Sequence, residues 1–276
     1  MSSGQKYYRQ KYWGEVMPVS VANSLHRLDQ DTFKQIAHAV VGTGFDIHRR
    51  LGRFFDESVY QRAVADRLKD AETEIQIIVT FKDYRKDYFV DLIISKGAVF
   101  ELKAVNQLNN EHRNQLVNYL LLTGLQHGKL LNFGGESMEH EFVNAKIGRS
   151  QRRAFCMEDQ NWEATRGFGD AEKKLAVDFL RDLGTGLSVP LYEEIFTHFF
   201  ADYRKVQVTI EGSPVGAQPT RMCAPGIGLK VTAFNDRVDD FERQIRRFLG
   251  HTSLTAIQWV NIALQKVTFS TIKEKV

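Results

Sequence analysis

The spacing of the apolar residues changes along the chain from a helical period to a period of two and back, and this change constrains the fold more than any other feature. Apolar residues recur at helical spacing from Asp31 to Gly52 and from Asp56 to Lys69, which predicts two amphipathic helices. Ile75, Ile77 and Val79 alternate with Glu74, Gln76 and Ile78, a period of two that is typical of a strand. Beyond this strand the patterns predict strands at residues 88–94 and 98–105, a helix at 111–123, and strands at 129–133 and 140–143.

Two polar runs separate the first three strands. Residues 82–87 and 95–97 carry turn-forming and charged side chains, so the strands are expected to form a consecutive antiparallel meander. The order helix, helix, meander, helix and strand pair predicts an α/β domain of about 115 residues.

Composition excludes several classes of protein. The 276 residues carry 37 Lys and Arg against 34 Asp and Glu, a formal net charge of +3, so a polyanion must be held by local patches and a histone-like binder is excluded. No stretch reaches the ~18 uncharged apolar residues that a membrane helix needs, and the amino terminus lacks a signal-peptide pattern, so we expect a cytoplasmic protein with no membrane partner. Cys156 and Cys223 have no Cys or His companions at metal spacing, which argues against a disulfide framework and a zinc site.

Three charged residues on two neighbouring strands form the candidate catalytic group. Glu101 and Lys103 project from one face of their strand, while Phe100 and Leu102 point to the opposite face and into the core. Asp91 precedes Glu101 across a short turn and can lie beside it on the ladder. Two carboxylates at close range raise each other's pKa, and Mg²⁺ or Mn²⁺ would resolve the repulsion. The alternative is three solvent-facing charges on an edge hairpin.

Six short motifs follow one another over about residues 31–147. They are Ile47-His48-Arg49-Arg50-Leu51-Gly52, Glu57-Ser58-Val59-Tyr60, Val90-Asp91, Phe100-Glu101-Leu102-Lys103, Gln115-Leu116-Val117-Asn118-Tyr119 and Leu131-Asn132-Phe133-Gly134. In this order and spacing they resemble the GxxExxY proteins, a family of the PD-(D/E)XK nuclease superfamily. The resemblance implies a restriction-endonuclease-like fold, a mixed sheet flanked by helices, with a metal-dependent phosphodiesterase site. The chain departs from the family at Phe54, where a glycine is usual, and this puts a tight positive-φ turn there in doubt.

The resemblance also implies roles for individual residues. Glu57, Asp91 and Glu101 match the metal ligands, and Asp91, Glu101 and Lys103 match the catalytic set, with Lys103 at the attacking water or at the phosphate charge. The cofactor implied is Mg²⁺ or Mn²⁺, and the implied partner is DNA or RNA.

Several further residues have a functional and a structural interpretation. Gln115 and Tyr119 match a Gln-x-x-x-Tyr helix shared with RecB-like exonucleases and are expected to position substrate, although they can also simply cap the sheet. His48 is a candidate for a place near the phosphate, but a histidine at a helix C-terminus is favoured by the helix dipole alone. Tyr60 is expected in the core. The basic cluster can contact phosphate or form a solvated helix end, and it consists of Arg49, Arg50 and Arg53.

The second half of the chain repeats parts of the first. Residues 178–184 parallel 46–52 at an offset of 132, and residues 244–249 parallel 115–120 at an offset of 129. The charged residues do not recur, because Glu101, Lys103 and Glu57 correspond to Lys230, Thr232 and Val189. We therefore predict a degenerate second copy without a metal site; the alternative is a chance match between two α/β halves.

The expected organisation has four parts. These are an N-terminal extension at 1–30 whose aromatic residues pack on the main body, a nuclease-like domain at 31–150, a linker at 151–168 and the degenerate domain at 169–276.

The leading prediction is a metal-dependent nuclease that hydrolyses phosphodiester bonds in DNA or RNA, with modest, salt-sensitive affinity. A non-catalytic nucleic-acid-binding or protein-interaction module with a vestigial site is the alternative, and a small-molecule phosphoesterase is a third class. The second copy can stand in for the second subunit of a homodimer, giving a monomeric pseudo-dimer, and a homo-oligomer stays open.

Overall fold

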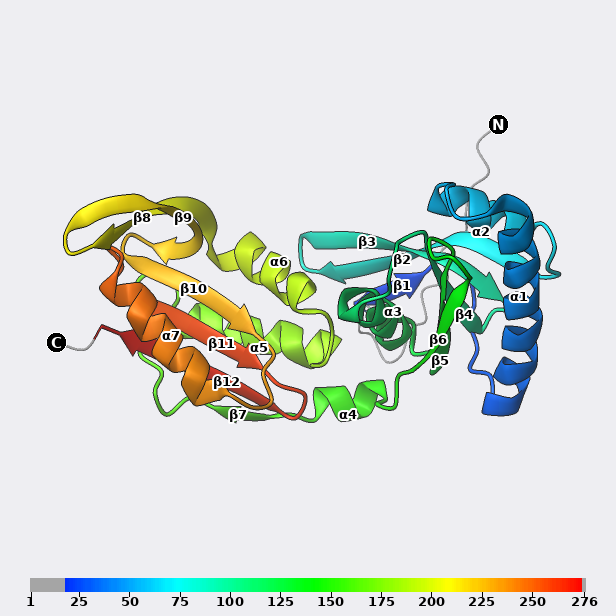
Figure 1. The fold of residues 1–276 in the computed structure, drawn as a ribbon. Coiled ribbons are helices and arrows are strands. Elements are labelled where there is room, and N and C mark those ends of the chain that lie inside the picture. The colour runs from blue at the N-terminus through cyan, green and yellow to red at the C-terminus, as the bar shows by residue number, and fades with distance from the viewer. Residues whose placement is uncertain (1–17, 275–276) are drawn as a thin grey trace, which may run out of the picture. The chain divides into compact units, whose positions relative to one another are not determined.

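The computed structural model describes residues 18–274, which fall into two compact units (Figure 1). Unit 1 ends at Arg149 and unit 2 begins at Ser150. Part of the expected N-terminal extension, with its aromatic residues Tyr7, Tyr8, Tyr12 and Trp13, lies outside the described residues.

Unit 1 contains one six-stranded mixed sheet in the order β1-β2-β3-β4-β5-β6. Its elements in chain order are β1 (Val19–Val21), α1 (Gln30–Leu51), α2 (Glu57–Ala65), β2 (Ala71–Phe81), β3 (Tyr84–Ile94), β4 (Ala98–Lys103), α3 (Asn110–Thr123), β5 (His127–Asn132) and β6 (Glu139–Asn144). Strands β2 to β4 form the predicted antiparallel meander, α3 crosses over to β5, which is parallel to β4, and β6 returns antiparallel.

The ends of α1 show why this long helix starts and stops where it does. The Asp29 carboxylate accepts hydrogen bonds from the N–H groups of Asp31 and Thr32 at 3.0 and 2.8 Å, which satisfies two donors that the helix itself cannot pair. At the other end Gly52 takes a φ of +73°, a conformation that favours glycine, and its N–H bonds the carbonyl of His48. The predicted end of this helix near Gly52 is therefore confirmed, whereas its start lies at Gln30, one residue before the predicted Asp31, because Asp29 is the capping residue.

The apolar face of α1 and α2 packs on the meander and on β5. Their buried stripe meets side chains of β3, β4 and β5 in one core, which includes Phe33, Val40, Ile47, Tyr60, Val64, Leu92, Phe100, Leu102, Leu131 and Phe133. Tyr60, Phe100 and Leu102 thus lie in the core, as predicted.

The predicted turn at residues 82–87 is wrong in extent. Only Lys82 and Asp83 form the turn, and β3 begins at Tyr84. The polar run continues the hairpin, because Tyr84 to Asp87 pair with Phe81 to Ile78 of β2. Arg85 and Asp87 form an ion pair at 3.0 Å along this exposed part of the strand. Charged composition alone therefore does not distinguish a loop from the solvated end of a long hairpin.

Unit 2 contains a second six-stranded mixed sheet, in the order β7-β12-β11-β10-β9-β8. Its elements, starting with the helix at the division between the units, are α4 (Arg149–Arg153), β7 (Cys156–Glu158), α5 (Asp170–Leu183), α6 (Val189–Phe200), β8 (Asp202–Ile210), β9 (Ser213–Ala224), β10 (Ile227–Thr232), α7 (Val238–Gly250), β11 (Ala256–Ile262) and β12 (Lys266–Lys273). Two mixed sheets flanked by helices confirm the expected α/β fold class.

Five strands of each unit share their order, and two strand pairs also share their register. In unit 1 Val99 pairs with Gly128, and in unit 2 Gly228 pairs with Ile257, so both partners are displaced by 129 residues. The last strand pair follows the same rule, since Gly128 pairs with Val143 and Ile257 with Ile272. The sixth strands differ: β1 pairs antiparallel with β2, whereas β7 pairs parallel with β12 at the opposite edge of the order.

The stretch 151–168, expected as a linker, belongs in part to the second sheet. It contains β7, and Phe168 is fully buried with its ring against Phe196 and Phe200. Within residues 18–274, no helix combines the length and the apolar character needed to cross a membrane.

Candidate functional site

Strand β4 carries its charged residues into the interior of unit 1. It lies between β3 and β5 and is not an edge strand. Glu101 is fully buried and Lys103 is 8% exposed, although both belong to the face opposite the core residues Phe100 and Leu102. Solvent-facing charges on an edge hairpin are therefore excluded for this pair.

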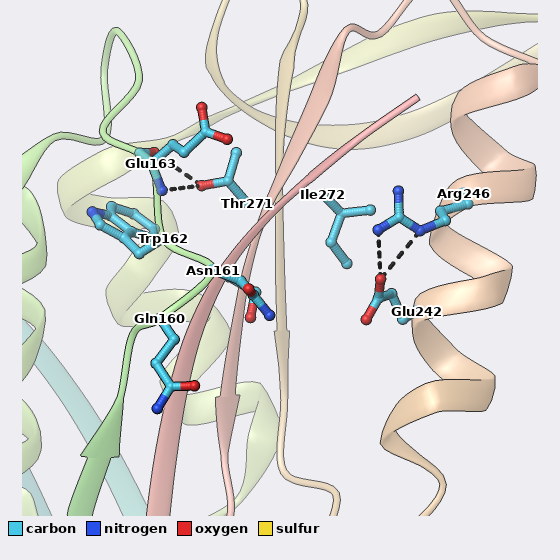
Figure 2. Close-up of a pocket in the computed structure, with 9 residues that line it drawn as sticks. Gln160, Asn161, Trp162, Glu163, Glu242, Arg246, Thr271 and Ile272 are labelled. Carbon is cyan, nitrogen blue, oxygen red and sulfur yellow. Dashed lines mark hydrogen bonds and ion pairs between the residues drawn. The ribbon is translucent and has the colours of Figure 1, made fainter. Parts of the chain in front are cut away.

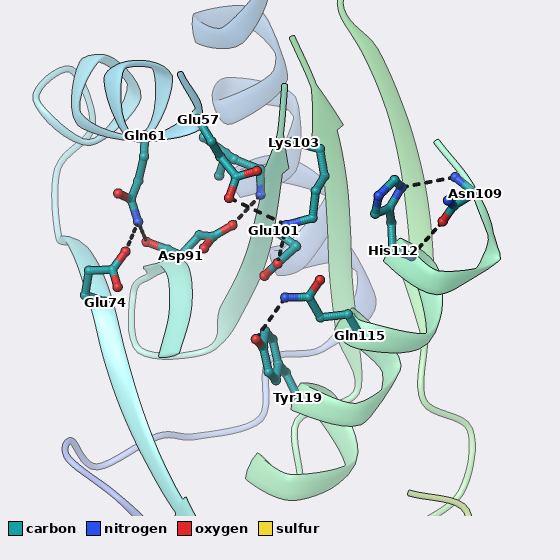
Figure 3. A network of polar contacts seen from close by, with 11 residues as sticks. Glu57, Gln61, Glu74, Asp91, Glu101, Lys103, Asn109, His112, Gln115 and Tyr119 are labelled. Atoms are coloured by element: carbon teal, nitrogen blue, oxygen red, sulfur yellow. Dashed lines mark hydrogen bonds and ion pairs between the residues drawn. The ribbon is translucent and has the colours of Figure 1, made fainter. Parts of the chain in front are cut away.

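The Lys103 ammonium lies between two carboxylates (Figure 3). Its Nζ is 2.7 Å from Glu101 Oε1 and 3.6 Å from Glu57 Oε1, and Glu57 is the first residue of α2. Burial lowers the pKa of Lys103, but Glu101 and Glu57 outweigh burial, so the pKa is raised and the amine stays charged. One buried cation thus balances part of a cluster of acids.

Asp91 lies on β3 next to Glu101, because the register pairs Leu92 with Phe100. Its Oδ2 accepts a hydrogen bond from the Leu102 N–H at 2.7 Å. Burial raises the pKa of Asp91 to about 6, and burial together with the Asp91 charge raises the pKa of Glu101 to about 8. The two carboxylates therefore resist being ionised together without a further positive charge.

Glu101 Oε2 is the unsatisfied atom of this site. It is buried and has no hydrogen-bond partner among the described residues, whereas Oε1 bonds Lys103. A buried carboxylate oxygen without a partner is costly, and a hard cation is the partner that carboxylate oxygens take. The donor set of Glu101, Asp91 and Glu57 therefore fits Mg²⁺ or Mn²⁺ in chemistry.

The carboxylates of Glu57, Asp91 and Glu101 do not form a preorganised metal site in this structure. Across residues 18–274 there is no cluster of three or more His, Cys, Asp or Glu side chains already arranged for an ion. The reason is visible in the contacts: the Lys103 ammonium lies between Glu57 and Glu101, and Asp91 bonds the backbone of β4. The assignment of all three as direct ligands stays a prediction.

Two residues that sequence analysis missed join this group. Gln61 Nε2 donates to the Asp91 carbonyl oxygen at 2.8 Å and to Glu74 Oε1 at 2.6 Å, which ties α2 to β2 and β3 (Figure 3). Gln61 is four residues after Glu57 and therefore on the same helix face, which is the signal that could have found it. Glu74 has a φ of +53°, uncommon for a non-glycine residue in a strand, and no sequence pattern indicates that conformation.

Gln115 and Tyr119 belong to α3, and their side chains lie near Glu101 of β4 (Figure 3). Gln115 Nε2 donates to the Tyr119 hydroxyl oxygen at 3.0 Å. Burial, followed by the Glu101 charge, raises the pKa of Tyr119 to about 12, so the phenol stays protonated and can donate a hydrogen bond. The structure thus brings both residues to the acidic cluster, while their role in substrate binding stays a prediction.

His48 and Arg49 make other contacts. The His48 Nε2 lies 3.2 Å from the carbonyl oxygen of Gly135, and Arg49 forms an ion pair with Asp46 one turn earlier on α1. Neither side chain is bonded to the acidic cluster within the described residues. Their predicted substrate contacts stay predictions.

The corresponding positions of unit 2 carry different chemistry. The register places Lys230 and Thr232 where unit 1 has Glu101 and Lys103. Thr232 Oγ1 donates to Asn261 Oδ1 at 2.8 Å and accepts from Trp259 Nε1 at 2.9 Å, so its polar group is satisfied locally. Burial, with Arg221 as a second cause, lowers the pKa of Lys230.

A cavity of about 310 Å³ lies in unit 2 between the 160–163 segment, β12 and α7 (Figure 2). Some of its polar groups bond one another: Glu242 pairs with Arg246 at 2.6 Å, and Thr271 Oγ1 donates to the Glu163 carbonyl at 2.9 Å. Trp162 Nε1 is buried there without a partner, but among the described residues the lining has no unpartnered acid comparable to Glu101, so the cavity is not the candidate site.

Comparison with known proteins identifies the fold that carries the cluster. Residues 34–145 match the family model of the PD-(D/E)XK nuclease superfamily, a range that includes Glu57, Asp91, Glu101 and Lys103. No curated protein matches the chain. The crystal structure of SSO0001 aligns at 20% identity over 44% of this chain and 61% of that chain with a TM-score of 0.29, which is too low to bear on fold or function. The narrower resemblance to GxxExxY proteins stays a prediction.

Proposed function

We propose that this protein, whose residues 34–145 form a PD-(D/E)XK nuclease superfamily domain, hydrolyses phosphodiester bonds in DNA or RNA with Mg²⁺ or Mn²⁺ as cofactor. The observation that carries the proposal is the buried, unpartnered Oε2 of Glu101 beside a second carboxylate of raised pKa. A cluster that needs one more positive charge, within this superfamily, is best explained by a catalytic divalent ion.

Asp91 and Glu101 would hold the ion directly, and Glu57 directly or through a water molecule. Glu57 is the most accessible of the three, with 40% of its side chain exposed, which suits an outer position. Bound Mg²⁺ or Mn²⁺ would stabilise charge on the phosphate and lower the pKa of a coordinated water.

Lys103 has a donor to spare. An ammonium carries three N–H donors, and within the described residues Lys103 uses one of them in a hydrogen bond to Glu101, while Glu57 at 3.6 Å forms an ion pair with it. A remaining N–H can hold the attacking water or a phosphate oxygen, and the raised pKa keeps the amine charged at neutral pH. The protonated Tyr119 hydroxyl, held by Gln115, can donate to the same phosphate or to its neighbour.

The experiment that tests the function is cleavage of labelled single-stranded and double-stranded DNA and RNA with Mn²⁺. We expect Lys103→Ala to lower the rate by roughly 100-fold or more. Lys173→Ala is the matched control, because Lys173 is also mostly buried and ion-paired, with Asp159, but lies in unit 2. Equal cleavage by wild type and Lys103→Ala would discard the site.

The competing function is a nucleic-acid-binding or protein-interaction module with a vestigial site. The absence of a ready-made cluster of three ligands within residues 18–274 favours it. Calorimetry with Mn²⁺ separates the two proposals. If the wild-type protein shows no heat of Mn²⁺ binding, binds nucleic acid and cleaves none, the results support the binding module and contradict the enzyme.

Unit 2 is, in this proposal, a copy of unit 1 that has lost its site. The shared register at an offset of 129 and the replacement of Glu101 by Lys230 support it. A monomer in solution is the expected state if the second copy replaces the partner of a homodimer. Light scattering that reports a symmetric dimer would contradict this part of the proposal.

A further inference from the structure

Phe54 is a solvent-exposed aromatic residue that lies close along the chain to the candidate site. It belongs to the short connection between α1 and α2, three residues before Glu57. Its residue surface is 89% exposed, while the neighbouring Phe55 is 47% exposed. A ring with almost no protein contact contributes little to the core, so its position calls for another explanation.

The connection itself is fixed. The fully buried Tyr60 donates its hydroxyl hydrogen to the Gly52 carbonyl at 2.7 Å and accepts from the Phe55 N–H at 3.3 Å. The Tyr60 ring stacks on Phe133 at 4.5 Å between centroids. Phe54 is therefore presented to solvent by an anchored loop.

Unit 2 builds the same connection without an exposed aromatic residue. Tyr192 donates to the Gly184 carbonyl at 2.7 Å and accepts from the Leu187 N–H at 3.0 Å, which repeats the Tyr60 contacts. At the same offset of 132, Gly186 takes the place of Phe54 and the buried Leu187 that of Phe55. Closing this loop therefore does not require an exposed phenylalanine.

The charges around Phe54 indicate the chemistry of its partner. The Arg53 guanidinium lies 5.3 Å from the Phe54 ring centroid, and Arg50 is exposed one residue before the end of α1. Neither arginine has an acidic partner within the described residues, whereas Arg49 pairs with Asp46. An exposed ring with one unpaired guanidinium against it and a second four residues earlier in the chain matches a nucleobase and its phosphates, because bases stack on aromatic rings and phosphates pair with arginine.

We propose that Phe54 is a stacking platform for an unpaired base of single-stranded nucleic acid, with Arg50 and Arg53 on the adjacent phosphates. This inference deepens the proposed nuclease function. It rests on that function for the position at which the bound strand is cleaved. In a duplex the faces of the bases are covered by their neighbours, so the platform would favour single strands or frayed ends.

The test is binding of labelled oligonucleotides of about 12 nucleotides, measured by fluorescence anisotropy in EDTA so that no cleavage occurs. We expect Phe54→Ala to weaken single-strand binding roughly fivefold to 100-fold, the loss of one stacked base, and to leave duplex binding within about twofold. Phe54→Trp should restore binding and Phe54→Leu should not, because a leucine keeps the apolar contact but not the flat ring.

Two controls isolate the stacked base. Tyr203→Ala is the matched variant, since Tyr203 is 59% exposed with the Arg221 guanidinium 4.9 Å from its ring, but lies in unit 2; it should bind as wild type. An oligonucleotide with abasic positions should bind wild type and Phe54→Ala equally.

Two results would overturn the platform. The first is an equal loss of affinity for single strands and duplexes in Phe54→Ala. The second is wild-type affinity for single strands in Phe54→Leu or Phe54→Ala, which would instead point to a protein that docks on the exposed rings. Because the assay contains no metal, a failed platform and a failed nuclease give different results. If the protein cleaves nucleic acid and Phe54→Ala binds single strands as wild type does, only the platform proposal fails. If Phe54→Ala loses single-strand binding but the wild-type protein cleaves nothing, only the nuclease proposal fails.

Discussion

Units 1 and 2 share the order of five strands, yet within residues 18–274 only unit 1 buries a carboxylate, that of Glu101. Both keep the register of the central strands and the tyrosine that bridges the two helices, Tyr60 in one and Tyr192 in the other. At the position where unit 1 buries Glu101, unit 2 has Lys230.

This difference separates what the fold needs from what the site needs. Unit 2 keeps the order of the strands and satisfies Thr232 through Asn261 and Trp259, so the fold is built there without a buried carboxylate. Burying Glu101 raises its pKa to about 8 and leaves one oxygen unpartnered, which works against stability. A feature that the fold can omit and that costs stability is best understood as functional.

The largest expected effect concerns catalysis. Replacing Glu101 by Gln keeps the shape of the side chain but removes the charge, so we expect cleavage to fall roughly 100-fold to 10,000-fold. The matched variant is Glu193→Gln, which removes a partly buried acid paired with Arg221 in unit 2 and should leave the rate unchanged. A similar loss of cleavage rate in both variants would mean that the two units contribute equally to catalysis, which would contradict the assignment of the site to unit 1.

The next effect concerns metal binding. We expect calorimetry to detect one Mn²⁺ site per chain and Asp91→Asn to weaken binding at least tenfold, a lower bound taken from the usual effect of disturbing residues around a metal. A second site of similar affinity, unaffected by Asp91→Asn, would show that unit 2 still binds metal.

A moderate effect is expected at the shared tyrosines. Tyr60→Phe and Tyr192→Phe each remove one hydroxyl that bridges a carbonyl and an N–H group, and both hydroxyls are buried. Each variant should lower the free energy of unfolding by about 1–3 kcal/mol, measured by urea denaturation. Unequal losses would show that the two connections are less alike in energy than in geometry.

The smallest expected effect is on the pH dependence of stability without metal. The folded-state pKa values of Asp91 and Glu101, about 6 and about 8, lie above their ordinary values of 3.8 and 4.5. At these two groups the folded protein therefore binds more protons than the unfolded chain, and stability falls as pH rises from about 4 to about 8. Lys103 does not titrate in this range, because its pKa is raised from 10.5.

Melting in EDTA at about pH 5.5 and about pH 8.5 checks this expectation, with a fall of a few degrees for wild type. Glu101→Gln should reduce the fall, and Mn²⁺ should stabilise the protein more at the higher pH. A fall of equal size in Glu101→Gln would place its origin in other groups.

Much of unit 1 could be predicted from local patterns. The helical spacing of apolar residues between Asp31 and Gly52 and the alternation of Ile75, Ile77 and Val79 are local features, and the order of the elements follows from them. The capping residue was not predicted, because Asp29 and Asp31 are equally suited by type and the structure uses Asp29. The same alternation predicts that Glu101 and Lys103 share a face. The turn between β2 and β3 was misjudged because polar side chains suit both a loop and an exposed hairpin end.

Contacts between distant residues were harder to predict. Gln61 reaches the backbone of Asp91 and the carboxylate of Glu74, and neither partner follows from sequence spacing. The short hairpin between β3 and β4 made the neighbouring positions of Asp91 and Glu101 predictable, but not the hydrogen bond from Leu102 that occupies one Asp91 oxygen.

The sequence by itself determined the order of helices and strands, the shared face of Glu101 and Lys103, and the recurrence of elements in the second half. Period and offset are properties of neighbouring residues along a chain, so they need no tertiary information. Only the tertiary structure decided that β4 is a central strand, that Glu101 is buried with one oxygen unpartnered, and that Phe54 stands in solvent. Burial, and with it the pKa of a carboxylate, depends on which other elements pack against a residue, and this is settled when the sheet and helices assemble.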